Sequence, residues 1–264
     1  MERRGTRMNV IKSCFIAVSL YSRIPVPQFA WKKEDMKYVL CFFPWVGAAI
    51  GICIWLWNRL CIFVGIGEIC RLAVDLAIPI IITGGFHADG FMDVMDASHS
   101  CQSRERKMEI LSDAHIGAFA VLMIALYGVV WLGAFSEIKE EGLLLAVCAG
   151  FFLSRCLCGI SVLTFPLAKQ EGMLYAVAHS SGKAMTACSL YLQGIACVGF
   201  MFYAAGLRGI LVALSCGLSL GYYYIRSRRE FGGVTGDTSG YFVLLSEACM
   251  ASTAAAIDLA LRIM

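Results

Sequence analysis

Most of this chain consists of apolar stretches that are long enough to cross a lipid bilayer. A transmembrane helix needs about 20 mainly apolar residues. Seven stretches approach or exceed that length, at residues 38–64, 69–85, 117–135, 142–165, 184–205, 207–225 and 241–263. With 59% hydrophobic residues, 16% charged residues and a mean hydropathy of +0.73, the chain is too apolar for a soluble domain. We therefore predict an all-α, polytopic integral membrane helical bundle with about six or seven transmembrane helices, of which the short second stretch is the least secure because it carries Asp75.

The segment ahead of these stretches predicts an additional helix at the membrane surface. Residues 8–22 are apolar, but this segment is short and is bounded by the charged side chains of Lys12 and Arg23. Pro25 and Pro27 lack backbone donors and prevent the helix from continuing. Since no repeat, low-complexity segment or linker divides the sequence, we expect one membrane domain over residues 1–264.

An acidic run interrupts the apolar pattern between residues 84 and 117. If the run is helical from Asp89 onward, spacings of four and three residues place Asp89, Asp93 and Asp96 within roughly 60° of one another on one face. Three neighbouring carboxylates repel one another unless a cation lies among them. Oxygen ligands suit Mg²⁺, which usually takes one or two carboxylates, some waters and the phosphates of a substrate. The run therefore indicates metal-assisted phosphoryl chemistry at a membrane.

Lysine and arginine are distributed unequally between the segments that connect the apolar stretches. With a cytoplasmic N-terminus and seven crossings, one side receives sixteen of the 22 basic residues, and the other receives Arg59, Arg71, Lys139, Arg208 and Arg262. Because cytoplasmic segments are enriched in these residues, the count favours a cytoplasmic N-terminus. This orientation brings the acidic run and the segments 169–172 and 232–238 to the same cytoplasmic face, where they can form one site.

Two of the polar segments have both a functional and a structural interpretation. The glycine-rich segment 232–240 is either a turn between helices or a phosphate cradle ahead of a helix N-terminus. Arg104, Arg106 and Lys107 either anchor the chain at the cytoplasmic surface or bind phosphate oxygens through their charged groups.

Charged and titratable residues within or beside the apolar stretches are further candidates. Arg155 lies inside the fourth stretch, where a charge is costly and usually faces a partner or a water-filled cavity. Glu247, in the last stretch, is its candidate partner or lines the same cavity. His87 adjoins the acidic run and is a candidate metal ligand, proton carrier or orienting group.

Four separated motifs occur in an order that resembles a known family. They are Arg23-Ile24-Pro25-Val26-Pro27, Gly84-Gly85-Phe86-His87-x-Asp89-Gly90-x-x-Asp93-x-x-Asp96, Arg104-Glu105-Arg106-x-x-Glu109-Ile110 with Asp113 and Ile116-Gly117, and Gly-Gly-x-Thr-Gly-Asp-Thr at 232–238. Together they resemble adenosylcobinamide-GDP ribazoletransferase, the cobalamin synthase of bacteria and archaea, and they span nearly the whole chain.

The resemblance implies an integral membrane, Mg²⁺-dependent transferase of late cobalamin synthesis, in the plasma (inner) membrane. Such an enzyme joins adenosylcobinamide-GDP to α-ribazole or its 5′-phosphate, and it releases GMP. The expected partners are these small molecules and the lipid bilayer, with no nucleic acid. The resemblance implies metal-binding and catalytic roles for Asp89, Asp93, Asp96 and Asp113, with His87 as a further catalytic candidate. It implies contacts with the substrate phosphates or nucleotide for Arg104, Arg106, Arg155, Lys169, Glu171, Asp237 and Glu247.

The chain departs from the family pattern at two places beside these carboxylates. Ala97 stands where the family normally has glycine, and we expect it to stiffen a turn. Ala114 and His115 replace the usual Ser-Arg pair after Asp113, so Arg104 or Arg106 would have to supply the missing charge.

Two other functions are weighed against this one. CDP-alcohol phosphotransferases also use clustered aspartates, but their pattern needs Asp-Gly-x-x-Ala-Arg, whereas Asp89-Gly90 is followed here by Phe91-Met92-Asp93. A cation transporter should place paired charges near the bilayer midplane on broken helices. The acids of this chain are instead predicted mainly in a cytoplasmic loop together with arginines, which favours phosphate chemistry.

Overall fold

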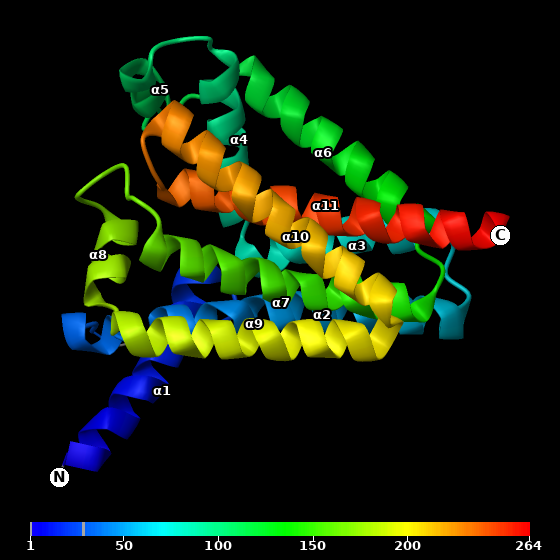
Figure 1. Cartoon of the computed structure of the whole chain (residues 1–264), viewed down its shortest axis with the longest axis horizontal. Coiled ribbons are helices and arrows are strands. Elements are labelled where there is room, and N and C mark those ends of the chain that lie inside the picture. The colour runs from blue at the N-terminus through cyan, green and yellow to red at the C-terminus, as the bar shows by residue number, and fades with distance from the viewer. Residues whose placement is uncertain (1, 28–29) are drawn as a thin grey trace.

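The computed structural model describes residues 2–27 and 30–264, and their regular structure is helical (Figure 1). In chain order the elements are α1 (Glu2–Tyr21), the 3₁₀ turn η1 (Lys33–Met36), α2 (Val39–Val64), α3 (Glu68–Thr83), α4 (Phe86–His99), α5 (Arg104–Ile110), α6 (Ala118–Glu137), α7 (Glu141–Thr164), α8 (Met173–Ser180), α9 (Lys183–Ala205), α10 (Leu207–Arg226), the π-helical turn η2 (Ser227–Phe231) and α11 (Gly236–Ile263).

Five helices are individually long and apolar enough to cross a membrane, namely α2, α6, α7, α9 and α11. They coincide with five of the seven predicted stretches, so the prediction of a polytopic helical membrane protein is confirmed. Most of the apolar window of α7 is buried, at 72%, whereas only 17% of that of α6 and 22% of that of α9 are buried. Helix α7 is therefore the centre of the bundle, and α6 and α9 present apolar side chains to the surroundings, as lipid-facing helices do.

The other two predicted stretches differ from a simple crossing. Residues 69–85 form α3, which has only 16 residues and spans about 24 Å at 1.5 Å per residue. Helix α3 is long and apolar enough to cross a membrane only when it is taken together with α4, and the two helices meet at an angle of 96°. The break falls at Gly84 and Gly85, whose φ angles of 68° and 80° are readily adopted by glycine. Helix α10 covers 207–225 and is less apolar, since it contains Arg208, Arg226 and three tyrosines.

The bundle has two distinct ends. Helices α5 and α8 and the turn from α10 into α11 lie at one end, together with α4, which stands across the direction of the long helices (Figure 1). We call this the acidic end, and we treat α4 as lying outside the spanning segments. The far end holds the connections from α2 to α3 and from α6 to α7, and the C-terminus. The predicted helix over residues 8–22 is part of α1, which ends at Tyr21 ahead of the two prolines and packs on α2.

Glycines bring the two central helices, α2 and α7, unusually close together. A Cβ atom on Gly47 would lie 2.1 Å from the backbone oxygen of Phe151, and one on Gly51 would lie 2.2 Å from that of Cys148. Small residues four apart allow this close approach in membranes, where van der Waals packing drives helix association. The Gly47-x-x-x-Gly51 spacing therefore fixes the pair of helices around which the others pack.

Candidate functional site

Helix α4 carries the acidic motif on one face and packs through the other. Its buried residues are His87, Gly90, Phe91, Val94, Met95 and Ala97. Asp89 is exposed, and Asp93 and Asp96 are half-buried. The condition that the run is helical from Asp89 onward is met, whereas the expectation that these acids lie mainly in a loop is wrong, because all three are on helix α4. The expectation that Ala97 stiffens a turn is wrong, because residue 97 lies inside α4 and is fully buried, where alanine favours the helix.

Four carboxylates lie close enough at this face for their negative charges to repel one another. Burial, together with the negative charges of Asp89, Asp237 and Asp96, raises the pKa of Asp93 to about 7. Asp237 comes from the first turn of α11, which is distant in sequence. Neighbouring like charges disfavour the ionised form of an acid unless a cation compensates them. The structure thus extends the predicted row on α4 by the carboxylate of Asp237.

The two helices that carry these acids touch at a glycine. A Cβ atom on Gly90 would lie 2.8 Å from both the Cα and the backbone oxygen of Asp237. Thr235 begins α11 as its N-cap, since its hydroxyl accepts a hydrogen bond from the backbone N–H of Thr238 at 3.1 Å. The glycine-rich segment is therefore the N-terminus of a helix that is aimed at the acidic face, where the helix dipole is positive.

The predicted convergence of three polar segments is confirmed. The backbone of Val234 pairs with that of Leu167 in an isolated bridge, and Lys169 donates a hydrogen bond from Nζ to Ser112 Oγ at 2.9 Å. The guanidinium of Arg104 occupies the space beside Gly232, where a Cβ atom would lie 1.1 Å from Nη2. Residues around 104–113, 166–169 and 232–237 consequently meet at the acidic end.

Three of the predicted residues lie at the periphery of this site. Asp113 is exposed, and its carboxylate accepts a hydrogen bond from the backbone N–H of His115 at 3.0 Å and contacts the His115 ring at 2.6 Å. These hydrogen bonds from His115 lower the pKa of Asp113. Arg106 pairs with Glu109 one turn along α5, and Glu171 is exposed in the loop before α8. His115, which replaces the arginine of the family pattern, thus contacts the predicted acid directly.

Three predicted residues lie behind α4 and away from its acidic face. Arg155 and Glu247 are 1% and 4% exposed, and they form an ion pair with 2.5 Å between Nη1 and Oε1. His87 is 4% exposed, and its ring lies 5.8 Å from that of Phe43. The prediction that Glu247 is the partner of Arg155 is confirmed, and the pair joins α7 to α11.

Glu230 in η2 is a residue of this end that the sequence reasoning missed. Its carboxylate accepts hydrogen bonds from Ser98 Oγ at 2.8 Å, from Lys107 Nζ at 3.0 Å and from Arg226 Nε at 3.0 Å. Burial raises the pKa of Glu230, but the Lys107 and Ser98 hydrogen bonds and the Arg226 charge outweigh it, and the net pKa is lowered. Only the four-residue spacing from Arg226 hinted at this role in the sequence.

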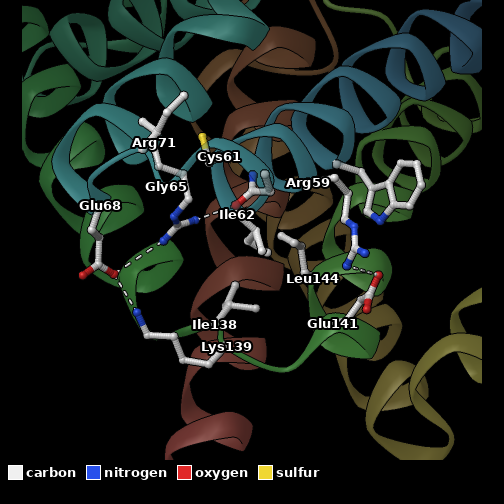
Figure 2. Close-up of a pocket in the computed structure, with 13 residues that line it drawn as sticks. Arg59, Cys61, Ile62, Gly65, Glu68, Arg71, Ile138, Lys139, Glu141 and Leu144 are labelled. Atoms are coloured by element: carbon white, nitrogen blue, oxygen red, sulfur yellow. Dashed lines mark hydrogen bonds and ion pairs between the residues drawn. The ribbon is translucent and has the colours of Figure 1, made fainter.

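A cavity of about 540 Å³ lies at the far end of the bundle and contains none of the motif residues (Figure 2). Its charges already neutralise one another: Glu68 lies 2.6 Å from Lys139 and 3.5 Å from Arg71, and Arg59 lies 3.2 Å from Glu141. Figure 2 shows these pairs on opposite sides of the cavity, with Ile62 and Leu144 between them. Paired acids and bases of this kind tie helix ends together, so the acidic end remains the candidate site.

Comparison with known proteins identifies the family. The sequence model of the cobalamin-5-phosphate synthase family matches residues 13–255, which includes every motif described above. The chain belongs to this family.

Curated relatives share most of the length of this chain. An adenosylcobinamide-GDP ribazoletransferase of Lachnoclostridium phytofermentans is 36% identical over 244 residues, which cover 91% of this chain and 92% of the relative. Proteins of the same name from Ralstonia nicotianae and Clostridium perfringens SM101 are 30% and 26% identical over 237 residues each, covering 87% and 89% of this chain and 89% and 94% of the relatives. No solved structure matches the chain.

Proposed function

We propose that this chain is an adenosylcobinamide-GDP ribazoletransferase that joins adenosylcobinamide-GDP to α-ribazole or its 5′-phosphate and releases GMP. The observation that carries the proposal is the meeting of Asp89, Asp93 and Asp96 on α4 with Asp237 at the N-terminus of α11. An acidic face beside basic side chains and a helix N-terminus suits a phosphate-bearing substrate. The family match and the shared name of the relatives support the same reaction, and they do not favour a CDP-alcohol phosphotransferase or a cation transporter.

The carboxylates on α4 have the donor chemistry for Mg²⁺. Among residues 2–27 and 30–264, no three Asp, Glu, His or Cys side chains converge closely enough to hold a metal by themselves. Magnesium commonly takes only one or two carboxylates and completes its shell with water and substrate phosphates. One or two of the carboxylates of Asp89, Asp93 and Asp237 would accordingly hold it, with Asp96 beside them. When bound, the ion neutralises charge on the diphosphate and on the leaving GMP.

The remaining chemistry is assigned to the chain's own residues. A ribose hydroxyl of the ribazole attacks the phosphorus that carries the cobinamide arm, the bond from that phosphorus to the GMP oxygen breaks, and the hydroxyl proton passes to a carboxylate. Asp89 is the exposed acid of the row and therefore the one that reaches this hydroxyl. Arg104 lies beside Gly232, and the positive charge of Lys169 acts on Asp237; both side chains would hold phosphate oxygens.

The proposed location is the plasma membrane, with the acidic end facing the cytoplasm. The N-terminus and the loops that meet at this end contain sixteen of the 22 basic residues, and basic residues accumulate on the cytoplasmic side. Nucleotide substrates are water-soluble and would reach the site from that side.

Release of GMP from adenosylcobinamide-GDP by the purified protein tests the proposal. We expect turnover with α-ribazole or its phosphate in the presence of Mg²⁺, and a loss of at least about 100-fold in Asp89→Asn and Asp93→Asn, since each removes a charge that acts on the transition state. Glu141→Gln, an exposed acid at the far end, is the matched control and should retain activity. Turnover of CDP-alcohol substrates alone, or near-normal rates in both aspartate variants, would contradict the assignment.

A further inference from the structure

A small cavity lies behind α4, on the side opposite to its acidic face. Its volume is about 100 Å³, and α3, α4, α6, α7 and α11 all contribute to its wall. Most of the lining is apolar, but four titratable side chains reach it from four different helices: His87, Tyr127, Arg155 and Glu247. Titratable groups inside a membrane protein are costly and are usually retained for a function.

Two buried polar atoms beside this cavity have no hydrogen-bond partner among the described residues. They are Nδ1 of His87 and Nε of Arg155, in side chains that are 4% and 1% exposed. The other end of the Arg155 guanidinium is well satisfied, since Nη1 donates to Glu247 Oε1 and to the backbone oxygen of Phe151. Leaving a buried donor or acceptor unpaired costs a large part of its desolvation energy, and native proteins rarely do so.

We propose that this cavity binds a small cluster of ordered water that connects His87 Nδ1 to Arg155 Nε. One water needs only a small fraction of this volume and two to four polar partners. Arg155 Nε donates to the cluster, and Nδ1 of a neutral His87 ring accepts from it. Water fits better than an anion because Glu247 lines the same cavity and would repel negative charge.

The proposed water cluster makes His87 a positioning residue for the acidic row. Through the water, the His87 ring anchors the buried side of α4 to the α7–α11 ion pair, while Asp89 and Asp93 project from the other side of the same helix. The backbones of α4 and α11 are in close contact here, since a Cβ atom on Gly240 would lie 2.9 Å from the His87 carbonyl oxygen. Loss of the water would remove the side-chain anchor, and even a small rotation of α4 about this contact would move its carboxylates relative to Asp237. This catalytic consequence rests on the proposed function, whereas the presence of water does not.

Substitutions that fill the cavity distinguish a water-filled cavity from an empty one. Gly128 of α6 lines the cavity, and a Cβ atom there would lie 3.8 Å from the nearest side-chain atom, Leu76 Cδ2. Gly133 lies on the same helix with nothing within 4 Å of a Cβ. Gly128→Ala and Gly128→Leu are compared with Gly133→Ala and Gly133→Leu, which correct for helix propensity, by thermal unfolding in detergent.

If the cavity is hydrated, Gly128→Leu displaces water and lowers Tm by about 2–4 °C for each hydrogen bond lost, relative to the Gly133→Leu control. In a dry apolar cavity the same side chain gains contacts and raises Tm. A rise, or no difference from the control, overturns the proposal. Gly128→Ala adds a methyl group that fits without a clash. A Tm for Gly128→Ala close to that of Gly133→Ala shows that position 128 tolerates a side chain, so that a lower Tm of Gly128→Leu comes from filling the cavity and not from a failure to fold.

Replacement of His87 tests the positioning role. His87→Asn keeps an acceptor and a donor and should retain most of the Tm and of the activity, whereas His87→Leu should lower Tm and raise KM for adenosylcobinamide-GDP severalfold. If His87 instead carries a proton in the reaction, His87→Asn loses kcat and changes the pH profile while Tm is unaffected, and the positioning role is wrong. If the unaltered protein has no transferase activity, the proposed function fails, and the Tm comparisons still decide whether water is present.

Discussion

Individual residues at the acidic end are constrained by neighbours from distant parts of the sequence. Gly232 shows this most directly, because its φ of +78° is readily adopted by glycine and the Arg104 guanidinium fills the space where a side chain would stand. Arg104 is thus placed beside the N-terminus of α11 without needing an acidic partner. This contact holds a cation beside the segment that leads into α11, where substrate phosphates are proposed to lie.

Gly232→Ala should therefore affect substrate binding more than the chemical step. The methyl group displaces Arg104, and a left-handed backbone conformation costs alanine about 1–2 kcal/mol. We expect KM for adenosylcobinamide-GDP to rise about tenfold with a smaller change in kcat, measured by GMP release. Gly217→Ala, at an open position on α10, is the control. An unchanged KM would show that Arg104 does not contact the substrate.

At the scale of elements, the bundle depends on two kinds of junction. Glycines allow α2 to approach α7, and α4 to approach the start of α11, closely enough that backbones touch. Polar side chains join the short elements, as Glu230 joins α4, α5 and the end of α10. The first kind sets the frame of long helices, and the second holds the site elements against that frame.

The glycine junction predicts the effect of Gly51→Ala. A methyl group 2.2 Å from the backbone oxygen of Cys148 forces α2 and α7 apart, and overpacking of this kind typically costs about 1–3 kcal/mol. Thermal unfolding in detergent should show a Tm lower by several degrees than that of the unaltered protein. Gly199→Ala, on a surface of α9 with nothing within 4 Å, should leave Tm nearly unchanged. Equal effects of the two changes would contradict the role assigned to the Gly47-x-x-x-Gly51 spacing.

The Glu230 junction predicts a pH dependence of stability. Since the folded-state pKa of Glu230 is lowered, its ion pairs contribute stability above the unfolded value of 4.5, and this contribution is lost as the pH falls through the folded pKa. We expect Glu230→Gln to lower Tm by a constant amount between about pH 6 and pH 8, because Glu230 is ionised in both the folded and the unfolded state there. The difference from the unaltered protein should shrink below about pH 4.5. A difference that grows on acidification would show that the sign is wrong.

At the scale of the whole molecule, the two ends of the bundle differ in how their charges are arranged. The far end holds Arg59, Arg71 and Lys139 in ion pairs around its cavity. The acidic end holds an uncompensated row of carboxylates, with Arg104 and Lys169 nearby. Charges that satisfy one another stabilise helix ends, whereas an unbalanced group of acids is suited to a cation and a phosphate-bearing ligand.

Native cysteines allow the orientation of these ends to be measured. Cys70 is exposed in the first turn of α3 at the far end, and Cys101 is exposed between α4 and α5 at the acidic end. With the acidic end in the cytoplasm, a membrane-impermeant maleimide added to intact cells should label Cys70 and spare Cys101. Inverted membrane vesicles should give the opposite pattern, read by peptide mass spectrometry. Labelling of Cys101 from outside intact cells would reverse the proposed orientation.

The sequence by itself determined the membrane class, the approximate positions of the long helices and the acidic row on α4. These features follow from local regularities, because hydrophobic length and a four-and-three spacing act within one helix. It also predicted which loops meet, since the basic residues place them on one side. Local patterns did not predict the 96° break at Gly84 and Gly85, the burial of Ala97 inside α4, or the bridging role of Glu230.

Only the tertiary structure decided which polar groups belong together. Asp237 joins the acidic row because Gly90 lets the two helices touch, and His87 lines the same cavity as the Arg155–Glu247 pair because the buried side of α4 packs against α6 and α11. These partners are far apart in sequence, and their contacts depend on how helices pack sideways. The spacing of residues along a single helix carries no information about that packing.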